Sequence, residues 1–567
     1  MKKIYLKSAW THFSLKEKIL ALLCVALIVL GLYFLWLIIL GKITTFVPKQ
    51  GGKLKIGEVG KIVTLNPLLI QDNDVERDIS EIIYSGLFKV DGQGSYEPDL
   101  AQRIEVGPDG KTYDLYLKDN VFWQDGEKFS ADDVIFTLET ITNPSYRSPL
   151  RSLWLGIKVE KLNDYLIRFQ LNQPYNSFIS YLTVKIIPQH LWSQISPENF
   201  PLAEYNLKPI GTGPYRFLEF QKSSDGQILS YTLASNNHYF GLKPHIPLVV
   251  FKFYKTEDEA LNALLRKNVD GLAHLPLEQY PLLKNKNRFK ISRLLLPRYY
   301  AIFLNQSQNP LLKELKVRQA LELALDKSAL LNEVLDNQAI ILNSAISPGF
   351  TGYDDKLAEE NLYNPTEALT LLKEAGLDDF DGDHFLEKKE KNKITKVEIN
   401  LSYPANAQLD QLAQFVKNSW EKIGLKTNLI KIELNEIPKE ILVERQYEAL
   451  IFGNVFGQNP DLYAFWHSSQ KEAPGLNLSL YRNSKLDSLL EEARQTTNEE
   501  KRIIDLMAIQ KIINDDKPAI FLYNPYYLSI YRTNLKGNDG LKMADYPSEQ
   551  FSQINQWYLY QKRALKI

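Results

Sequence analysis

Cysteine is almost absent from this sequence: the 567 residues contain one, Cys24. A single thiol excludes an intramolecular disulfide, and it excludes zinc and iron–sulfur sites that need several cysteines. Histidine is scarce as well, with seven residues and no pair spaced four apart for joint metal ligation on a helix. Net charge is close to zero, because 67 lysines and arginines face 68 aspartates and glutamates. The chain as a whole is therefore not a polycation of the kind that binds nucleic acid.

Familiar catalytic motifs are also missing. The patterns G-x-S-x-G, H-E-x-x-H and C-x-x-C do not occur. Residues 107–112 end like a phosphate-binding loop, but Glu105 stands where its first glycine belongs. Gly211-Thr212-Gly213 begins like a dinucleotide fingerprint, yet Arg216 replaces the third glycine. These absences predict a protein that is not an enzyme and that needs no cofactor.

Three aspartates, Asp379, Asp381 and Asp383, are spaced like the first ligands of a calcium loop. The glycine of such a loop would fall at His384, and Gly382 comes two positions early. We interpret the segment as an acidic turn and expect no resident metal. Weak cation binding is the alternative.

The first 50 residues have the pattern of a membrane anchor. Residues 19–40 are 22 consecutive uncharged positions, which as a helix span the ~30 Å core of a bilayer. Five lysines precede this run and two follow it closely, so the positive-inside rule predicts a cytoplasmic segment 1–18, a transmembrane helix 19–40, a linker 41–50 and an extracytoplasmic remainder. A cleaved signal peptide is the alternative; the length of the run and the lack of an A-x-A site disfavour it. Cys24 lies early inside the run, so we do not expect a lipid-modified cysteine.

The remainder alternates between strand-like and helix-like patterns, which indicates a mixed α/β class. Residues 112–117 alternate as a strand does. Asn364 and Pro365 form a typical helix start, with Glu367 completing a capping box. Residues 317–325 and 330–335 predict a pair of helices broken near Asp326.

A series of short motifs runs through residues 51–540. They are Gly52-Lys53-Leu54-Lys55-Ile56-Gly57, Leu65-Asn66-Pro67, Ile83-Tyr84-Ser85-Gly86-Leu87-Phe88, Glu97-Pro98-Asp99-Leu100-Ala101, Phe122-Trp123-Gln124-Asp125-Gly126, Ser130-Ala131-Asp132-Asp133-Val134, Pro209-Ile210-Gly211-Thr212-Gly213-Pro214-Tyr215, and Val317-Arg318-Gln319-Ala320-Leu321 with Ala324-Leu325-Asp326-Lys327. In this order and spacing the series resembles the extracytoplasmic solute-binding proteins of ABC importers. The class that it resembles is the oligopeptide-, dipeptide- and nickel-binding one, bacterial extracellular solute-binding protein family 5.

The resemblance implies an α/β, two-lobed periplasmic-binding-protein-like fold (type II, large oligopeptide-binder subtype) after one transmembrane helix. The larger lobe would comprise residues 51–298 plus 515–567, with 89–177 as a possible extra subdomain. The second lobe would comprise residues 299–514. The chain would cross between the lobes near Pro297 and Pro518.

The implied function is capture of peptides or similar solutes by hinge closure and their delivery to an ABC permease and its ATPase. The alternatives are a non-peptide solute, such as a metal chelate or an oligosaccharide, and a surface receptor without transport. We expect a monomer attached to the cell membrane, with its N-terminus in the cytoplasm, its main domain outside and no nucleic-acid partner.

The resemblance also implies where ligand contacts lie. Onto this sequence they fall at Glu76, in the strand with Tyr299 and Tyr300, and in a loop before Pro460. That loop contributes Phe456, Gly457, Gln458 and Asn459, with the aromatic residues Trp466 and Trp123 nearby. For the aromatic residues the alternative is core packing, and for Glu76 it is a solvated loop acid.

One position departs from the family pattern. Peptide binders of the family have an aspartate four residues before this proline, and it pairs with the ligand's α-ammonium group. Phe456 occupies that position here. A buried ammonium group without a partner carboxylate would be strongly destabilised. Either another acid such as Glu76 or Asp461 substitutes for the aspartate, the ligand is longer, blocked or not a peptide, or the alignment shifts by a residue or two.

Overall fold

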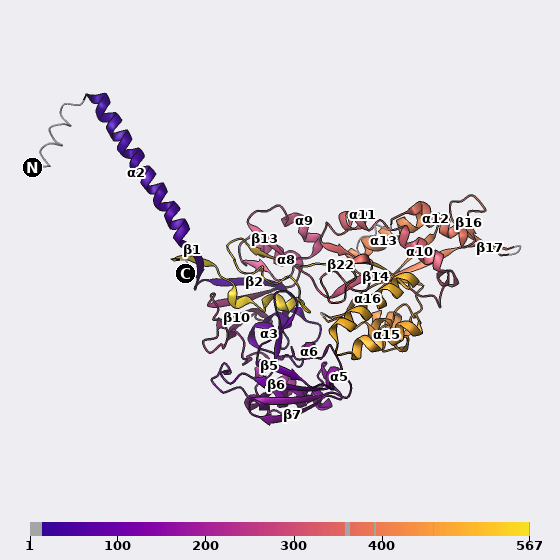
Figure 1. The fold of residues 1–567 in the computed structure, drawn as a ribbon, viewed down its shortest axis with the longest axis horizontal. Coiled ribbons are helices and arrows are strands. Elements are labelled where there is room, and N and C mark those ends of the chain that lie inside the picture. The colour runs from indigo at the N-terminus through magenta and orange to yellow at the C-terminus, as the bar shows by residue number, and fades with distance from the viewer. Residues whose placement is uncertain (1–13, 358–362, 391–392, 458, 566–567) are drawn as a thin grey trace, which may run out of the picture.

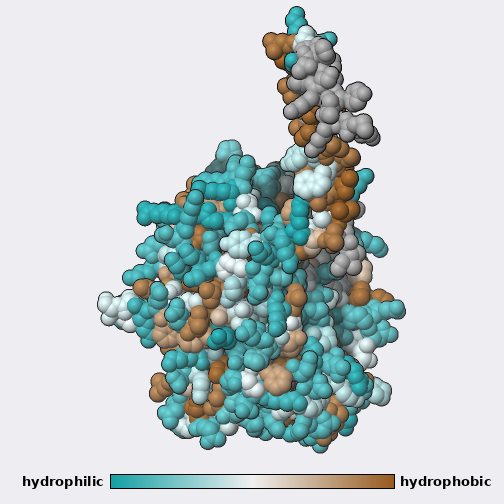
Figure 2. Space-filling model, turned by 90° about the vertical axis from the view of Figure 1, so that its left-hand side faces the viewer, coloured by the Kyte–Doolittle hydropathy of each residue, from teal (hydrophilic) through white to brown (hydrophobic). Residues whose placement is uncertain are grey.

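A long apolar helix stands clear of the folded body (Figure 1). The computed structural model describes residues 14–357, 363–390, 393–457 and 459–565. Helix α2 (Leu15–Ile43) begins at a capping box between Ser14 and Glu17, and among the described residues it is the helix long and apolar enough to cross a membrane. Figure 2 shows its apolar side chains projecting from a largely hydrophilic body.

The segment after α2 is a strand. Strand β1 (Thr44–Lys49) pairs antiparallel with β24 (Tyr560–Leu565), next to the C-terminus. Most of the predicted linker 41–50 is therefore hydrogen-bonded to the end of the chain. The helix is thus joined directly to the folded body.

The larger lobe is built on a seven-stranded mixed sheet. Its order is β13-β23-β12-β2-β11-β10-β9. The strands are β2 (Lys53–Val59), β9 (Tyr215–Lys222), β10 (Ile228–Ser235), β11 (Leu248–Tyr254), β12 (Gly271–Leu272), β13 (Phe289–Leu294) and β23 (Tyr527–Arg532). Helices α3 (Asp74–Ile83) and α8 (Glu257–Leu265) contribute apolar residues to the two cores beside this sheet.

A second, four-stranded sheet lies in the same lobe, within the predicted subdomain 89–177. Its order is β5-β6-β8-β7, with strands β5 (Ala101–Val106), β6 (Thr112–Leu117), β7 (Lys158–Asn163) and β8 (Leu166–Gln170). Strand β6 confirms the alternation in the sequence. Helix α4 (Ala131–Thr142) begins at the cap Ser130 and covers this sheet. Apolar residues of both sheets form one core, so residues 89–177 are packed into the lobe.

The Gly211-Thr212-Gly213 motif has a structural explanation. A Cβ atom at Gly211 would lie 2.0 Å from the backbone oxygen of Ile83, and the Gly213 N–H donates to that same oxygen at 2.8 Å. The glycines therefore allow close approach of two backbone segments.

The second lobe is built on a six-stranded sheet of order β15-β22-β14-β21-β19-β20. The strands are β14 (Arg298–Leu304), β15 (Ala339–Ile341), β19 (Glu398–Pro404), β20 (Lys426–Ile432), β21 (Ala449–Val455) and β22 (Ala519–Pro525). The helices that pack on this sheet or next to it are α10 (Leu315–Leu323), α11 (Lys327–Glu333), α12 (Pro365–Glu374), α13 (Ala407–Lys422), α15 (Ser484–Gln495) and α16 (Glu499–Asp516).

Two helix predictions in this lobe are confirmed. Asn364 caps α12 by accepting the N–H of Glu367 at 3.1 Å. Asp326 separates α10 from α11 and caps α11, because its carboxylate accepts the N–H of Ala329 at 2.9 Å.

The chain crosses between the two large sheets twice. It leaves β13 for β14, and it returns from β22 to β23. Strand β22 pairs with β14 and therefore belongs to the second sheet. We accordingly propose the second lobe boundary between Pro525 and Tyr527, about ten residues later than the sequence alone suggests.

Candidate functional site: two cavities between the lobes

A cavity of about 370 Å³ lies between the lobes, and we call it the loop cavity. The larger lobe contributes Arg77, Tyr175 and Tyr546 to its wall, and the loop after β21 contributes Phe456, Gly457, Asn459 and Asp461. This volume falls in the range of small-molecule sites, about 300–1,000 Å³. The loop cavity can therefore hold a small solute between two separately folded walls.

Direct contacts between the lobes border the loop cavity. The Asn459 side-chain amide donates to the Asn176 side-chain oxygen at 2.8 Å, and the Ser177 hydroxyl donates to the Asn459 backbone oxygen at 3.2 Å. The Tyr175 hydroxyl donates to the Asp461 carboxylate at 3.4 Å. Arg494 pairs with Asp461 at 3.1 Å and lies over the Tyr175 ring at 5.5 Å. The two lobes are thus in direct contact beside the loop cavity.

A buried arginine holds the loop that follows β21 in place. Arg502 is 1% exposed, donates to the backbone oxygen of Pro460 at 3.0 Å and pairs with Glu499 at 3.2 Å. Because a buried guanidinium group is costly without partners, this bond ties the position of the loop to helix α16. The bond therefore fixes one wall of the loop cavity.

Several charged side chains of the loop-cavity wall are paired. Glu81 forms an ion pair with Lys185 at 2.8 Å, and both are largely buried. Burial raises the pKa of Glu81, and Lys185 partly opposes that shift. Glu549 has a raised pKa as well, from burial and then from the neighbouring Asp545.

A second cavity, of about 420 Å³, lies beside the strands that cross between the lobes, and we call it the crossing cavity. Arg298 and Tyr300 of β14 and Tyr527 of β23 line it, together with Glu58 and Asp78. Arg298 donates to the backbone oxygen of Pro525 at 3.3 Å, and its Nε has no hydrogen-bond partner among the described atoms. The cavity is therefore polar.

The carboxyl groups of the crossing cavity differ from ordinary surface acids. Glu58 and Asp78 are 7% and 1% exposed. Burial raises the pKa of each well above its usual range, and the charge of Asp74, which also lines the cavity, adds to both shifts. Burial of Arg298 lowers its pKa. This cavity therefore favours the protonated form of its buried acids.

The predicted site residues fall in three places. Phe456, Gly457 and Asn459 line the loop cavity, and Tyr300 lines the crossing cavity. Tyr299 is fully buried, where its ring packs against Phe456 at 6.2 Å and its hydroxyl accepts a bond from Asn454 at 3.1 Å. Adjacent strand residues face opposite sides of a sheet, so Tyr299 and Tyr300 cannot serve one cavity in the same way. Gln458 lies outside the described residues.

The other three predicted residues lie inside the lobes. Trp466 is 1% exposed and packs against Phe303 and Phe521 in the second lobe. Trp123 is fully buried in the larger lobe. Both positions fit the alternative of core packing, and a role in ligand contact stays a prediction.

Glu76 is also buried, at 3% exposed. Its carboxylate accepts the backbone N–H groups of Val63 at 2.5 Å and Thr64 at 2.9 Å, and its own N–H bonds to the cap Asn73. Burial raises the pKa of Glu76. The residues that line the two cavities do not include it. The structure thus gives Glu76 a bracing position inside the larger lobe, in place of the solvated loop that sequence reasoning offered as the alternative.

Several residues at the loop cavity carry no signal that the sequence analysis used. Tyr175 and Tyr546 line the cavity, and Arg494 contacts the wall residues Tyr175 and Asp461. The three come from distant parts of the chain and are brought together only by the fold. Asp461 was named as a substitute for the missing family aspartate. In the structure it lines the loop cavity while paired with Arg494 and Tyr175.

Comparison with known proteins shows to which family this chain belongs. The model for bacterial extracellular solute-binding proteins, family 5, matches residues 95–475. The chain belongs to this family. It is 29% identical over 518 residues to the oligopeptide-binding protein AppA of Bacillus subtilis, which covers 90% of this chain and 92% of that protein.

Solved structures agree with the family assignment. The structure of Bacillus subtilis AppA in complex with a nonapeptide has a TM-score of 0.68 and 28% identity, covering 91% of this chain and all of that one. NikZ from Campylobacter jejuni in complex with Ni(L-His) has a TM-score of 0.69 and 28% identity, covering 90% of this chain and all of that one. The two-lobed fold is thus shared by proteins with different ligands.

Proposed function

We propose that this protein is the membrane-anchored substrate-binding component of an ABC importer for peptides or similar solutes. The observation that carries the proposal is the loop cavity, which has walls from both lobes and is bordered by direct contacts between them. Family membership and the similarity to an oligopeptide-binding protein support the same reading. The protein binds its ligand without breaking bonds in it.

The mechanism is closure of the lobes about the two crossing strands. A ligand in the loop cavity touches both walls in the closed form and one wall in the open form. It therefore stabilises closure by the difference between its affinities for the two forms. The Asn459–Asn176 and Asp461–Tyr175 contacts form on closure and add to it. The closed protein then presents both lobes to the permease, and a separate ATPase supplies the energy.

The ligand's amino group needs a partner other than the usual aspartate. Phe456 occupies that position, Asp461 is paired with Arg494, and Glu81 is paired with Lys185. A free dipeptide held through its ammonium group at the usual position is therefore disfavoured. We propose a small or blocked peptide that depends on backbone hydrogen bonds and side-chain pockets, with Glu549 and Asp545 as the other acids of the same wall for an amino group.

Helix α2 would keep the binding protein at its permease. Its 29 residues exceed the roughly 20 that are needed to cross a bilayer. Strand β1, which follows the helix directly, is paired with β24 and so connects the helix to the folded body. Tethering raises the effective concentration of the binding protein at the membrane. This placement puts the two lobes outside the cell and the N-terminus inside.

The proposal is tested by calorimetric titration of the full-length protein in detergent micelles. Peptides of two to nine residues, N-acetylated peptides, Ni(L-His) and oligosaccharides are the ligands. We expect saturable binding of a peptide, which mass spectrometry then recovers unchanged. Binding of the nickel complex or of a sugar alone would contradict the peptide ligand and leave the solute-binding role in place. Conversion of the peptide would contradict a pure binding role.

The variant Asn459→Ala tests closure over the loop cavity. It removes the amide that bonds to Asn176, a loss of about 1 kcal/mol from the closed form, or about fivefold in affinity. The control Asn199→Ala changes an exposed asparagine of the larger lobe that bonds within its own turn, and it should leave affinity unchanged. Equal affinity of both variants and the parent protein would show that this contact does not form on closure.

A further inference from the structure

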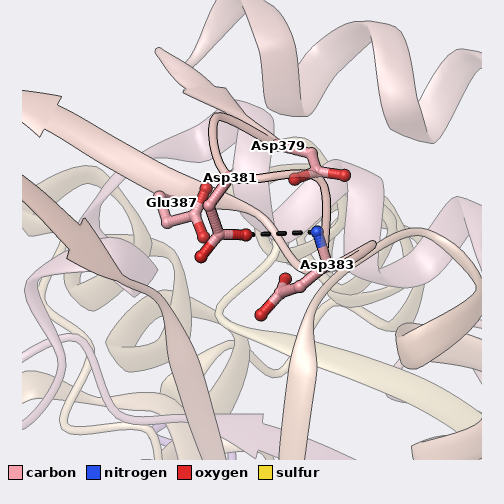
Figure 3. A group of neighbouring side chains, drawn as sticks. All are labelled: Asp379, Asp381, Asp383 and Glu387. Atoms are coloured by element: carbon pink, nitrogen blue, oxygen red, sulfur yellow. Dashed lines mark hydrogen bonds between the residues drawn. The ribbon is translucent and has the colours of Figure 1, made fainter.

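Four carboxylates meet at the tip of a small sheet far from α2. The loop between β16 (Leu377–Asp378) and β17 (Glu387–Glu390) carries Asp379, Asp381 and Asp383, and Glu387 is the first residue of β17. One carboxylate oxygen from each lies within 4.8 Å of all the others (Figure 3). Two oxygens on opposite sides of a calcium ion, each at about 2.4 Å, lie about 4.8 Å apart. The four groups therefore already fit around one ion.

Glu387 is the observation that separates this cluster from an ordinary acidic surface loop. It is 1% exposed, and its Oε1 has no hydrogen-bond partner among the described atoms. Its Oε2 accepts the N–H of Phe380 at 2.8 Å. Figure 3 shows the Glu387 carboxylate pointing toward that of Asp381. A buried carboxylate oxygen without a partner is costly, and a cation held by the same group of acids would satisfy it.

The sequence has His384 where a calcium loop has glycine, and the backbone of the loop shows that this residue still makes the required turn. A calcium loop needs glycine at its sixth position because the chain turns sharply there. His384 occupies that position and adopts a φ of +75°, in the left-handed region that glycine favours. The loop thus makes the turn without the glycine.

Charge in the loop also favours an added cation. Lys396 of β18 (Lys393–Lys396) pairs with Asp383 at 2.5 Å and with Asp381 at 3.2 Å. Its side chain is 60% exposed, so it can move aside into solvent. Once Lys396 has moved aside, the four carboxylates carry four negative charges. A divalent ion would lower that excess to two.

We propose that Asp379, Asp381, Asp383 and Glu387 bind one Ca²⁺ ion. The ligands are hard oxygen donors, and their spread suits the 6–8 oxygens that Ca²⁺ takes, with water completing the shell. Neither histidine nor cysteine belongs to the set, which disfavours zinc and copper. Extracellular calcium sites bind with dissociation constants of about 0.1–1 mM. On the outer face of a cell, the occupancy of such a site would follow the calcium concentration of the medium.

The ion would stabilise one end of the second lobe. Leu386 of the same loop donates to the backbone oxygen of Gly424, at the turn between α13 and β20, at 2.8 Å. Ordering the loop therefore orders this turn. None of the four acids lines the loop or crossing cavity, so the ion should change stability and leave ligand affinity unaltered.

The test is calorimetric titration of CaCl₂ into EDTA-treated full-length protein in detergent micelles, with thermal unfolding measured in parallel. We expect one site with a dissociation constant of 1 mM or tighter and a melting temperature that rises with calcium. MgCl₂ at the same concentration should bind at least tenfold more weakly, because Mg²⁺ demands shorter, octahedral coordination. No saturable heat and no rise in melting temperature up to 10 mM CaCl₂ would overturn the proposal, and so would equal binding of both ions.

Two variants locate the site. Glu387→Gln keeps the shape of the buried side chain and removes its charge, and Asp381→Asn changes an exposed member of the cluster. Each should weaken calcium binding at least tenfold and abolish the rise in melting temperature. The matched control is Asp378→Asn, because Asp378 precedes the cluster and pairs with Lys373 instead. If Asp381→Asn, which does not disturb the interior, binds calcium like the parent protein, the site is wrong whatever the behaviour of Glu387→Gln.

Discussion

The two cavities between the lobes differ in how their acids are partnered. In the loop cavity, Glu81 and Asp461 each have a cationic partner, Lys185 and Arg494, although burial raises the pKa of Glu549 in the same wall. In the crossing cavity, Glu58 and Asp78 are buried together, and both have raised pKa values. Paired charges keep a wall in a fixed shape at neutral pH, whereas buried acids close to one another hold a proton. The difference indicates that ion pairs fix part of the loop-cavity wall, whereas the buried acids of the crossing cavity make stability depend on pH.

The largest effect should come from Phe456→Ala in the loop cavity. Phe456 is 4% exposed and packs on Tyr299 and Phe350, so its truncation should lower the free energy of unfolding by about 3–5 kcal/mol. It should also enlarge the loop cavity while the crossing cavity keeps its shape. Urea unfolding measures the loss. The control Phe122→Ala removes a ring that is 40% exposed and should cost less than about 1 kcal/mol. Equal losses in the two variants would show that Phe456 is not part of the core.

The next effect concerns the ion pair of the loop cavity. Lys185→Met leaves Glu81 buried without its partner, so the free energy of unfolding should fall by about 3 kcal/mol at neutral pH. The loss should shrink toward about pH 5, because a protonated Glu81 needs no cation and its pKa is already raised by burial. Urea unfolding at several pH values measures both.

Lys89→Met is the matched control for that variant. Lys89 lines the same cavity, but its partner Glu97 is half-exposed, so the loss should stay below about 1 kcal/mol. A loss for Lys185→Met as small as that of Lys89→Met would show that the loop cavity is not held by buried ion pairs.

Sequence reasoning predicted the fold well because its signals are local. The cap at Asn364, the break at Asp326 and the alternation in residues 112–117 each act within one turn or one strand. The apolar length of α2 is equally local. Strands β1 and β24 pair residues that are more than 500 positions apart. No pattern in the sequence of residues 41–50 predicts this pairing.

The candidate site was harder to predict because it depends on direction and on distant contacts. Motif position placed Phe456 and Asn459 correctly beside a cavity, yet it could not tell that Tyr299 and Tyr300 face opposite sides of β14. It also could not tell that two backbone N–H groups bind the Glu76 carboxylate. Such facts depend on the tertiary fold, in which a charged residue is buried or exposed according to neighbours from elsewhere in the chain.

The smallest effect should come from the crossing cavity, where Asp78→Asn should make stability less sensitive to pH. A carboxyl group whose pKa is raised on folding holds its proton in the folded state after the unfolded chain has lost it, so the free energy of unfolding falls as pH rises from about 4 to about 7. Asp78→Asn removes one of the two coupled acids, and its curve should fall less steeply than that of the parent protein over this range. Glu58 changes together with Asp78, because the charge of Asp78 raises the pKa of Glu58, whereas buried acids that do not interact with Asp78 contribute equally to both proteins and cancel in the difference. Asp539→Asn is the control with the opposite sign: its bond to Lys290 lowers the pKa of Asp539, so the stability lost in that variant should be greatest at neutral pH and vanish in acid. If Asp78→Asn follows the parent curve, then Glu58 and Asp78 do not hold a proton between them, and the contrast between the two cavities fails.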